Sequence, residues 1–183
     1  DLKAFDISGE SNRETYGMHR FGQGCLLARR LVQHGVRCVE VHTGGFDMHE
    51  DLDSRAQDRF PTLDQGIAAL LDDLEANSML DQTLVVVGTE FGRTPVINMN
   101  GGRDHFPAAY STMMAGGGIV GGQAYGSTDK MGKKVTKGKV TPADFLATIG
   151  HAMGIPLEEV FYSPTRRPFT FAHKGKPVTQ LFG

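Results

Sequence analysis

Acidic and imidazole side chains, which bind divalent metals and move protons in proteins, gather in two polar segments of the chain. The first segment, residues 42–51, contains His42, Asp47, His49, Glu50 and Asp51. The second segment, residues 90–105, contains Glu90, Arg93, Arg103, Asp104 and His105. Each segment follows an apolar run typical of a strand, so both are candidate metal or catalytic sites.

Asp47 and His49 lie two residues apart in a loop that follows Gly44 and Gly45. A carboxylate and an imidazole at this spacing can reach one metal ion. Oxygen and nitrogen ligands suit Zn²⁺, Mn²⁺ or Fe, whereas Ca²⁺ prefers oxygen alone. The same pattern is typical of a polar loop that caps the next helix. His105, in a glycine-rich loop, is likewise either a ligand or a solvated side chain.

Glu90 follows the apolar run 84–88 and Thr89. A carboxylate at the rim of a buried strand costs free energy unless it has a partner. That partner is either a metal ion or the guanidinium of Arg93.

Two further motifs have a simpler interpretation. The spacing G-x-G-x-x-G occurs at residues 116–121, but no amphipathic helix follows it and no acid lies about 20 residues further on, so a dinucleotide site is rejected. Five lysines then form either a solvated hairpin or a basic rim that attracts an anionic substrate: Lys130, Lys133, Lys134, Lys137 and Lys139.

Composition limits the class of protein. The chain has 183 residues, of which 39% are hydrophobic and 22% charged, and its net charge is -2. These values indicate one globular domain over residues 1–183 and exclude disordered and collagen-like classes. Neither a nucleic acid nor a membrane is expected as a partner. Cys25 and Cys38 are too few for a disulfide framework, and both are predicted to be core thiols.

Hydrophobic periodicity predicts the elements that position the two polar segments. Helices are expected over residues 17–34, 54–77 and 141–153, with Pro61 marking a kink or the start of the second. Strands are expected over 36–41, 83–88 and 110–115. Residues 36–88 then form a right-handed βαβ unit of an α/β fold, which brings both polar segments to one edge of a parallel sheet. The tail, residues 155–183, is expected to be strapped over the domain.

Longer motifs resemble those of the DUF1501 family, and the resemblance covers nearly the whole chain. The motifs are GFDMH, TEFGRTP and GRDHFP, together with three longer stretches, at residues 45–49, 89–95, 102–107, 25–32, 122–129 and 141–149. This family is regarded as sulfatase-like and is similar to the alkaline phosphatase superfamily. The resemblance therefore implies a three-layer α/β/α sandwich with one or two metals at the strand ends.

The resemblance also implies roles for particular residues. Asp47, His49 and His105 look like the ligand set of one metal, with Zn, Mn, Ca or Mg as candidates. Glu90 is similar in position to an aspartate that holds a second metal, but Phe91 stands where that site has a histidine. Similar proteins are about twice as long and carry an export signal. This chain is therefore expected to be the C-terminal half of a periplasmic or secreted protein, with the nucleophile upstream.

The implied activity is hydrolysis of sulfate or phosphate esters, carried by a small molecule or a glycan. Arg93 and Arg103 would stabilise charge on the ester oxygens, and His42 would support the ligands or carry a proton. Two alternatives remain open. One is a non-catalytic domain that binds a glycan or a protein, which Phe91 favours. The other is an anion-binding domain with a structural metal.

Overall fold

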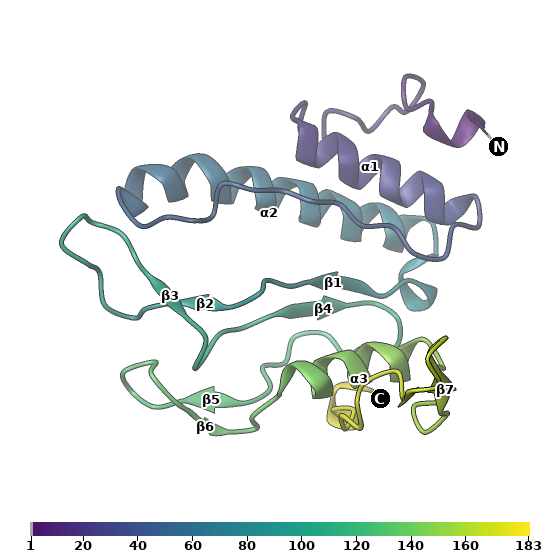
Figure 1. The fold of residues 1–183 in the computed structure, drawn as a ribbon. Helices are drawn as coiled ribbons and strands as arrows, with labels where there is room; N and C mark the ends of the chain where they lie inside the picture. Colours follow the sequence, from purple (N-terminus) through teal and green to yellow (C-terminus); the bar gives the residue numbers. More distant parts are fainter. Residues whose placement is uncertain (1) are drawn as a thin grey trace. The chain divides into compact units, whose positions relative to one another are not determined.

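The computed structural model describes residues 2–183, which divide along the chain into two compact units (Figure 1). Unit 1 comprises residues 2–79 and 96–104, and unit 2 comprises residues 80–95 and 105–183. No helix among these residues is long and apolar enough to cross a membrane.

Unit 1 is a helical hairpin with an ordered N-terminal segment. It contains the 3-10 helix η1 (Leu2–Phe5) and the helices α1 (Arg20–Gln33) and α2 (Leu52–Ala76), of which α1 and α2 lie side by side (Figure 1). Its core contains Tyr16, Cys25, Leu26 and Ala69. Gly66 of α2 allows the close approach, because a Cβ there would come within 2.9 Å of the Phe21 ring.

Both helices of unit 1 were predicted from their apolar periodicity, and α1 also has a local signal at each end. His19 caps α1, since its Nδ1 accepts a hydrogen bond from the Gly22 N–H at 3.0 Å. Just beyond α1, Gly35 adopts the left-handed conformation (φ +87°) that ends many helices. Pro61 lies inside α2, so its interpretation as the start of that helix is wrong.

The segment Val36–Val41 contradicts the strand prediction. It follows α1 without pairing with any strand in the described part of the chain. Apolar β-branched residues favour an extended backbone, but a strand also requires a hydrogen-bonded neighbour. Only one of the two predicted core thiols is in the core. Cys25 is buried, which raises its pKa to about 11, whereas Cys38 is exposed.

Unit 2 is built from short antiparallel pairs. Its elements in chain order are η2 (Leu80–Gln82), β1 (Val85–Val87), β2 (Gly92–Arg93), β3 (His105–Phe106), β4 (Met113–Ala115), β5 (Ser127–Thr128), β6 (Val135–Lys137), α3 (Pro142–Ala152), β7 (Phe161–Tyr162), β8 (Pro168–Phe169) and η3 (Thr179–Leu181). The pairs are β1–β4, β2–β3, β5–β6 and β7–β8.

The sheet topology corrects the predicted βαβ unit. Strands at 83–88 and 110–115 were predicted and are present as β1 and β4, but they pair antiparallel, with Val86 opposite Met114. The described residues therefore form a mixed α/β structure with three α-helices and two-stranded antiparallel sheets, in which no sandwich sheet is present. The two polar segments therefore do not meet at the edge of a parallel sheet, contrary to the prediction.

Helix α3 was predicted, and a capping box explains its sharp start. The Thr141 hydroxyl accepts from the Asp144 N–H at 3.2 Å, and the Asp144 carboxylate accepts from the Thr141 N–H at 3.0 Å. The tail contacts this helix. The Lys176 N–H donates to Asp144 at 2.8 Å, and the Val178 N–H donates to the Thr148 hydroxyl at 3.0 Å.

Candidate metal site

Two loops of unit 1 are joined by backbone hydrogen bonds and position the first group of site residues. The Arg103 N–H donates to the Met48 carbonyl at 2.9 Å, and the Leu52 N–H donates to the Gly101 carbonyl at 2.9 Å. Met48 is only 2% exposed and anchors its loop in the unit. Its neighbours in sequence, Asp47 and His49, are therefore held on a fixed backbone.

Asn98 organises the second of these loops. Its side-chain oxygen accepts from the Asn100 and Gly102 N–H groups at 2.9 and 3.0 Å. Its amide nitrogen donates to the His49 carbonyl at 3.0 Å and to Asp104 Oδ1 at 3.1 Å. Gly102 is required at its position because a Cβ would overlap the His49 carbonyl. One asparagine thus links the backbone of His49 to the carboxylate of Asp104.

His49 lies between two carboxylates. Its Nε2 is 3.0 Å from Asp47 Oδ1, and its Nδ1 is 2.8 Å from Asp104 Oδ1. The side chains of Asp47, His49 and Asp104 are 69%, 43% and 54% exposed, so a solvated ion can reach them. Asp47 and His49 were predicted as ligands, whereas Asp104 had no predicted role, because its importance depends on a contact across 55 residues of sequence.

The donor count at His49 decides what this arrangement can do. A neutral imidazole has one N–H donor and one acceptor nitrogen. If Nδ1–H donates to Asp104, then Nε2 presents a lone pair in the direction of Asp47. A lone pair beside a carboxylate oxygen is repulsive unless a proton or a cation lies between them. Two ligands of a tetrahedral Zn²⁺ lie about 3.3 Å apart, close to the observed separation.

Unit 2 holds the second group of predicted residues. Arg93 of β2 pairs with His105 of β3 in the antiparallel register. The Phe91 ring lies 4.3 Å from the His105 ring, centroid to centroid, and 6.0 Å from the Arg93 guanidinium carbon. The β2–β3 pair therefore brings Arg93 and His105 together, with Phe91 against the imidazole.

Three predicted residues are placed less favourably. Glu90 is exposed in the loop after β1 and forms no ion pair with Arg93 among the described residues, so the predicted cost of desolvating it does not arise. His42 is exposed, in the segment between α1 and α2 that contains neither helix nor strand at this point. Arg103 contributes its backbone N–H to the loop pairing.

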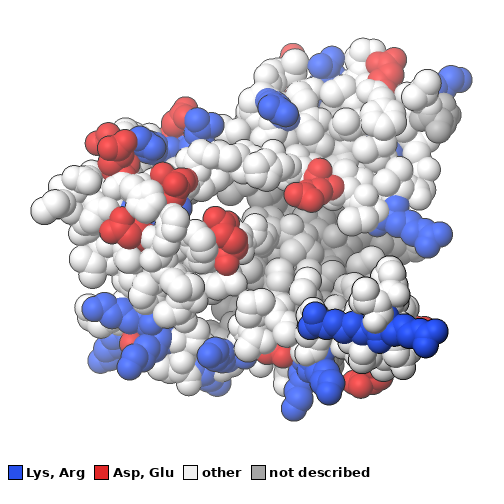
Figure 2. All heavy atoms as spheres, in the orientation of Figure 1, with Lys and Arg blue, Asp and Glu red and all other residues white. Residues whose placement is uncertain are grey.

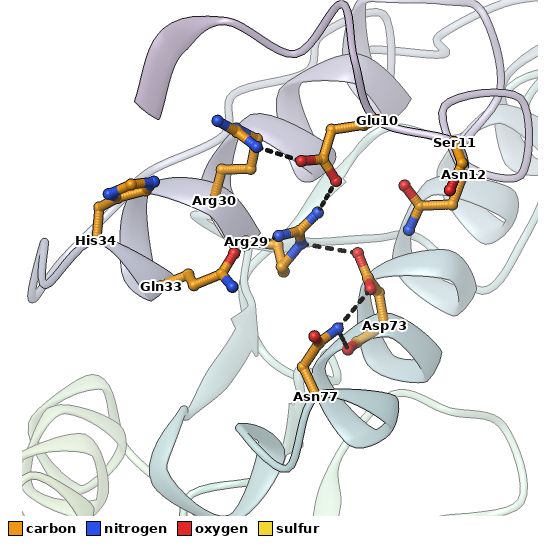
Figure 3. Close-up of a pocket in the computed structure, with 9 residues that line it drawn as sticks. All are labelled: Glu10, Ser11, Asn12, Arg29, Arg30, Gln33, His34, Asp73 and Asn77. Carbon is orange, nitrogen blue, oxygen red and sulfur yellow. Dashed lines mark hydrogen bonds and ion pairs between the residues drawn. The ribbon is translucent and has the colours of Figure 1, made fainter. Parts of the chain in front are cut away.

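A second polar cluster in unit 1 was missed. It lines a pocket of about 650 Å³ in which Arg29 is only 5% exposed (Figure 3). Its guanidinium contacts Glu10 and Asp73, the latter at 2.8 Å, and Glu10 also contacts Arg30. The Tyr16 hydroxyl donates to Asp73 at 2.7 Å. The sequence alone does not indicate that Arg29 is buried, because this depends on which helix packs against α1.

Burial and charge act in opposite directions in this cluster. Burial alone would lower the pKa of Arg29, but the carboxylates of Asp73 and Glu10 outweigh it and raise that pKa. Burial, together with the hydrogen bond to Asp73, strongly raises the pKa of Tyr16. Both groups therefore hold their protons at neutral pH, and the cluster is a fixed clamp between the N-terminal segment, α1 and α2.

The fold and this site define a mixed α/β protein with a candidate metal site. Over residues 2–182 the sequence matches the family described as "Protein of unknown function (DUF1501)". The chain belongs to the DUF1501 family, as its motifs predicted. No curated protein and no solved structure matches the chain.

Proposed function

We propose that Asp47, His49 and His105 bind one divalent metal ion. Each of these side chains offers one ligand atom, and His105 directly follows Asp104, whose carboxylate bonds to His49. The observation that carries the proposal is the position of the His49 ring between Asp47 and Asp104. In metal sites a ligating histidine donates its other N–H to a carboxylate, which fixes the ring.

The ligand set favours some metals over others. One carboxylate and two imidazoles suit Zn²⁺ and Mn²⁺, whereas Ca²⁺ and Mg²⁺ prefer oxygen ligands. Of the candidates Zn, Mn, Ca and Mg, we therefore place Zn and Mn first. A second metal at Glu90 has less support, because the Phe91 ring packs on His105 where the resemblance places another ligand.

We propose that the metal serves the hydrolysis of sulfate or phosphate esters. A bound divalent ion supplies Lewis-acid polarisation of the ester oxygen. Arg93, opposite His105 in the β2–β3 pair, binds the oxyanion through its planar fork of donors, and Arg103 adds a second guanidinium. His42 accepts or returns a proton. The attacking group comes from a part of the protein other than these residues.

The sandwich of the alkaline phosphatase type belongs to this proposal as well. Support comes from β1, whose three valines are half-buried although β1 has β4 as its one partner among the described strands. An apolar strand of this kind is typical of the interior of a larger sheet.

A metal titration tests the ligand set. We expect isothermal calorimetry to show that one Zn²⁺ or Mn²⁺ ion binds per chain. Asp47→Asn and His49→Gln should each weaken binding by at least about 100-fold, because each removes one of three ligands. The matched control is Asp58→Asn, which makes the same change of side chain at an acid of α2 that is 76% exposed. Equal binding by Asp47→Asn and Asp58→Asn would refute the site.

A panel of esters tests the activity. Aryl sulfates and aryl phosphates should be hydrolysed only in the presence of added metal, and Arg93→Gln should lower kcat/KM by about 100-fold or more because it removes an oxyanion donor. Metal binding without turnover of any ester would leave the site in place and refute the hydrolase.

The alternative function is a non-catalytic binding domain. The packing of Phe91 on His105 favours it, since an aromatic ring on a ligand reduces access to the metal. Affinity for a glycan that persists in a chelator, with no turnover, would support this alternative.

A further inference from the structure

The hairpin formed by β5 and β6, residues 127–139, concentrates positive charge. All its lysines are exposed, and they form a basic patch on one face of the molecule (Figure 2): Lys130, Lys133, Lys134, Lys137 and Lys139. Within residues 2–183 none of the five forms an ion pair with an acidic side chain. The chain as a whole has a net charge of -2, so this concentration is local.

The one acidic residue of the hairpin serves the backbone. Asp129 Oδ1 accepts hydrogen bonds from the N–H groups of Met131 at 3.2 Å and Lys133 at 2.8 Å. The Asp129 N–H donates to the Lys134 carbonyl at 2.9 Å. Its carboxylate therefore shapes the turn, and the lysine ammonium groups stay available to an external anion.

Three of the lysines converge on one concavity. A hollow of about 240 Å³ is lined by Ala108, Lys133, Lys134, Val135 and Lys139. It has no acidic residue in its lining. Like charges placed together destabilise one another, so a hollow with three lysine side chains is most favourable when it holds an anionic group.

This hollow adjoins the segment that carries two of the proposed site residues, and all of these residues belong to unit 2. A Cβ added to Gly132, in the turn of the hairpin, would lie 3.4 Å from Pro95, two residues beyond Arg93. Ala108, at the hollow, is three residues beyond His105. A ligand with several anionic groups in a row can therefore reach the hollow and the β2–β3 pair together.

We propose that the lysine hairpin binds an anionic polysaccharide, with one sulfate or carboxylate group in the hollow and its neighbours on Lys130 and Lys137. The assignment of this polymer as the substrate class rests on the proposed function. Nucleic acid is disfavoured because the hollow lacks the aromatic and arginine side chains on which bases stack. A membrane is disfavoured because Met131 is the hairpin's sole exposed large apolar residue.

Binding is tested with dextran sulfate in the presence of a chelator, so that the metal plays no part. We expect binding that weakens steeply with salt, and Lys133→Gln with Lys139→Gln to reduce affinity about tenfold or more at low ionic strength. Lys174→Gln with Lys176→Gln removes the same charge from the tail and should change affinity by less than about twofold. Unchanged thermal midpoints show that both variants remain folded.

Each other outcome overturns the proposal. Equal losses in the two double variants would mean that net charge alone drives binding. Tighter binding to a single-stranded DNA oligonucleotide, or to phosphatidylserine vesicles, would assign the hairpin to that partner instead. If uncharged dextran bound as tightly as dextran sulfate, the lysines would have no role in binding.

Turnover separates this inference from the proposed function. The double variant Lys133→Gln with Lys139→Gln should raise KM for a sulfated polymer about tenfold and leave the kcat and KM for a small aryl sulfate unchanged. An equal change for both substrates would overturn the substrate assignment. No turnover of either substrate, with lysine-dependent polymer binding intact, would refute the hydrolase and leave the binding site established.

Discussion

Arg29 and His49 both lie in unit 1, and each is a nitrogen side chain held between two carboxylates. Arg29 is 5% exposed, and its partners Glu10 and Asp73 are 18% and 10% exposed. His49 is 43% exposed, and its partners are more exposed still. The same pattern of charges therefore occurs once in a buried cluster, which we call the dry cluster, and once in a solvent-exposed cluster, which we call the wet cluster.

The setting decides what each arrangement contributes. In the dry cluster every charge already has a protein partner, so removing one leaves a buried carboxylate without compensation. In the wet cluster water can replace any partner, so the contacts add little to stability. An exposed, preorganised pair of ligands is instead free to bind an ion. Burial thus separates a structural clamp from a candidate metal site.

Substitution of the buried arginine should have the largest effect. Arg29→Met keeps most of the side-chain volume but leaves Glu10 and Asp73 without their shared cation. We expect the free energy of unfolding to fall by about 3 kcal/mol, measured by denaturant titration. The control Arg59→Met, at a side chain that is 50% exposed, should change it by less than about 0.5 kcal/mol. A loss below about 1 kcal/mol for Arg29→Met would contradict the comparison.

Substitution of Asp104 should affect metal binding more than stability. Asp104→Asn keeps the shape and an oxygen for the His49 N–H, but it removes the charge that makes the ring a better ligand. Metal affinity should fall about 10-fold to 100-fold, and the thermal midpoint in chelator should stay nearly unchanged. Glu50→Gln, next to His49 in sequence and paired with Arg55, should leave affinity unchanged. A drop in midpoint without a drop in affinity would make Asp104 a structural residue.

The sequence predicted the parts of this fold that short-range chemistry determines. Helices α1 and α3 begin at side-chain caps within three residues of their first turn, and α1 ends beside Gly35. The parallel βαβ unit failed because the partner of β1 is β4, about 30 residues away, and apolar residues alone do not choose between parallel and antiparallel neighbours.

The candidate site was predictable to the same extent. Asp47 and His49 are close in sequence, so their spacing was informative. The roles of Asp104 at His49 and of Asp73 at Arg29 depend on contacts across 55 and 44 residues. Electrostatic partners at such separations are set by the packing of whole elements, and no local pattern indicates them.

The capping box of α3 tests whether exposure alone makes a polar contact weak. Thr141 is exposed, yet its hydroxyl satisfies an N–H that the helix cannot pair by itself. Thr141→Ala should lower the free energy of unfolding by about 1 kcal/mol. Ser54→Ala, in the first turn of α2, removes a hydroxyl that accepts no helix N–H and should change it by less than about 0.5 kcal/mol. Equal effects would show that the cap geometry contributes nothing.

The smallest effect is expected from pH at Asp144. Hydrogen bonds from the Thr141 hydroxyl, the Lys176 N–H and the Thr141 N–H lower its pKa below the usual value near 3.8. Since the folded state then binds a proton less readily than the unfolded state, this contribution to stability is present above about pH 4 and disappears as the pH falls through the lowered pKa. Asp144 is partly exposed, so solvent screening limits the contribution to a few tenths of a kcal/mol.

The measurement compares the chain with Asp144→Asn at a series of pH values, since other carboxylates titrate equally in both and cancel. The difference in unfolding free energy between the two proteins should shrink as the pH falls below about 4. A difference that stays constant to about pH 2 would show that the carboxylate charge has no part in the cap. Asp144 would then stabilise α3 through hydrogen-bond geometry alone, which Asn can reproduce in part through its side-chain oxygen.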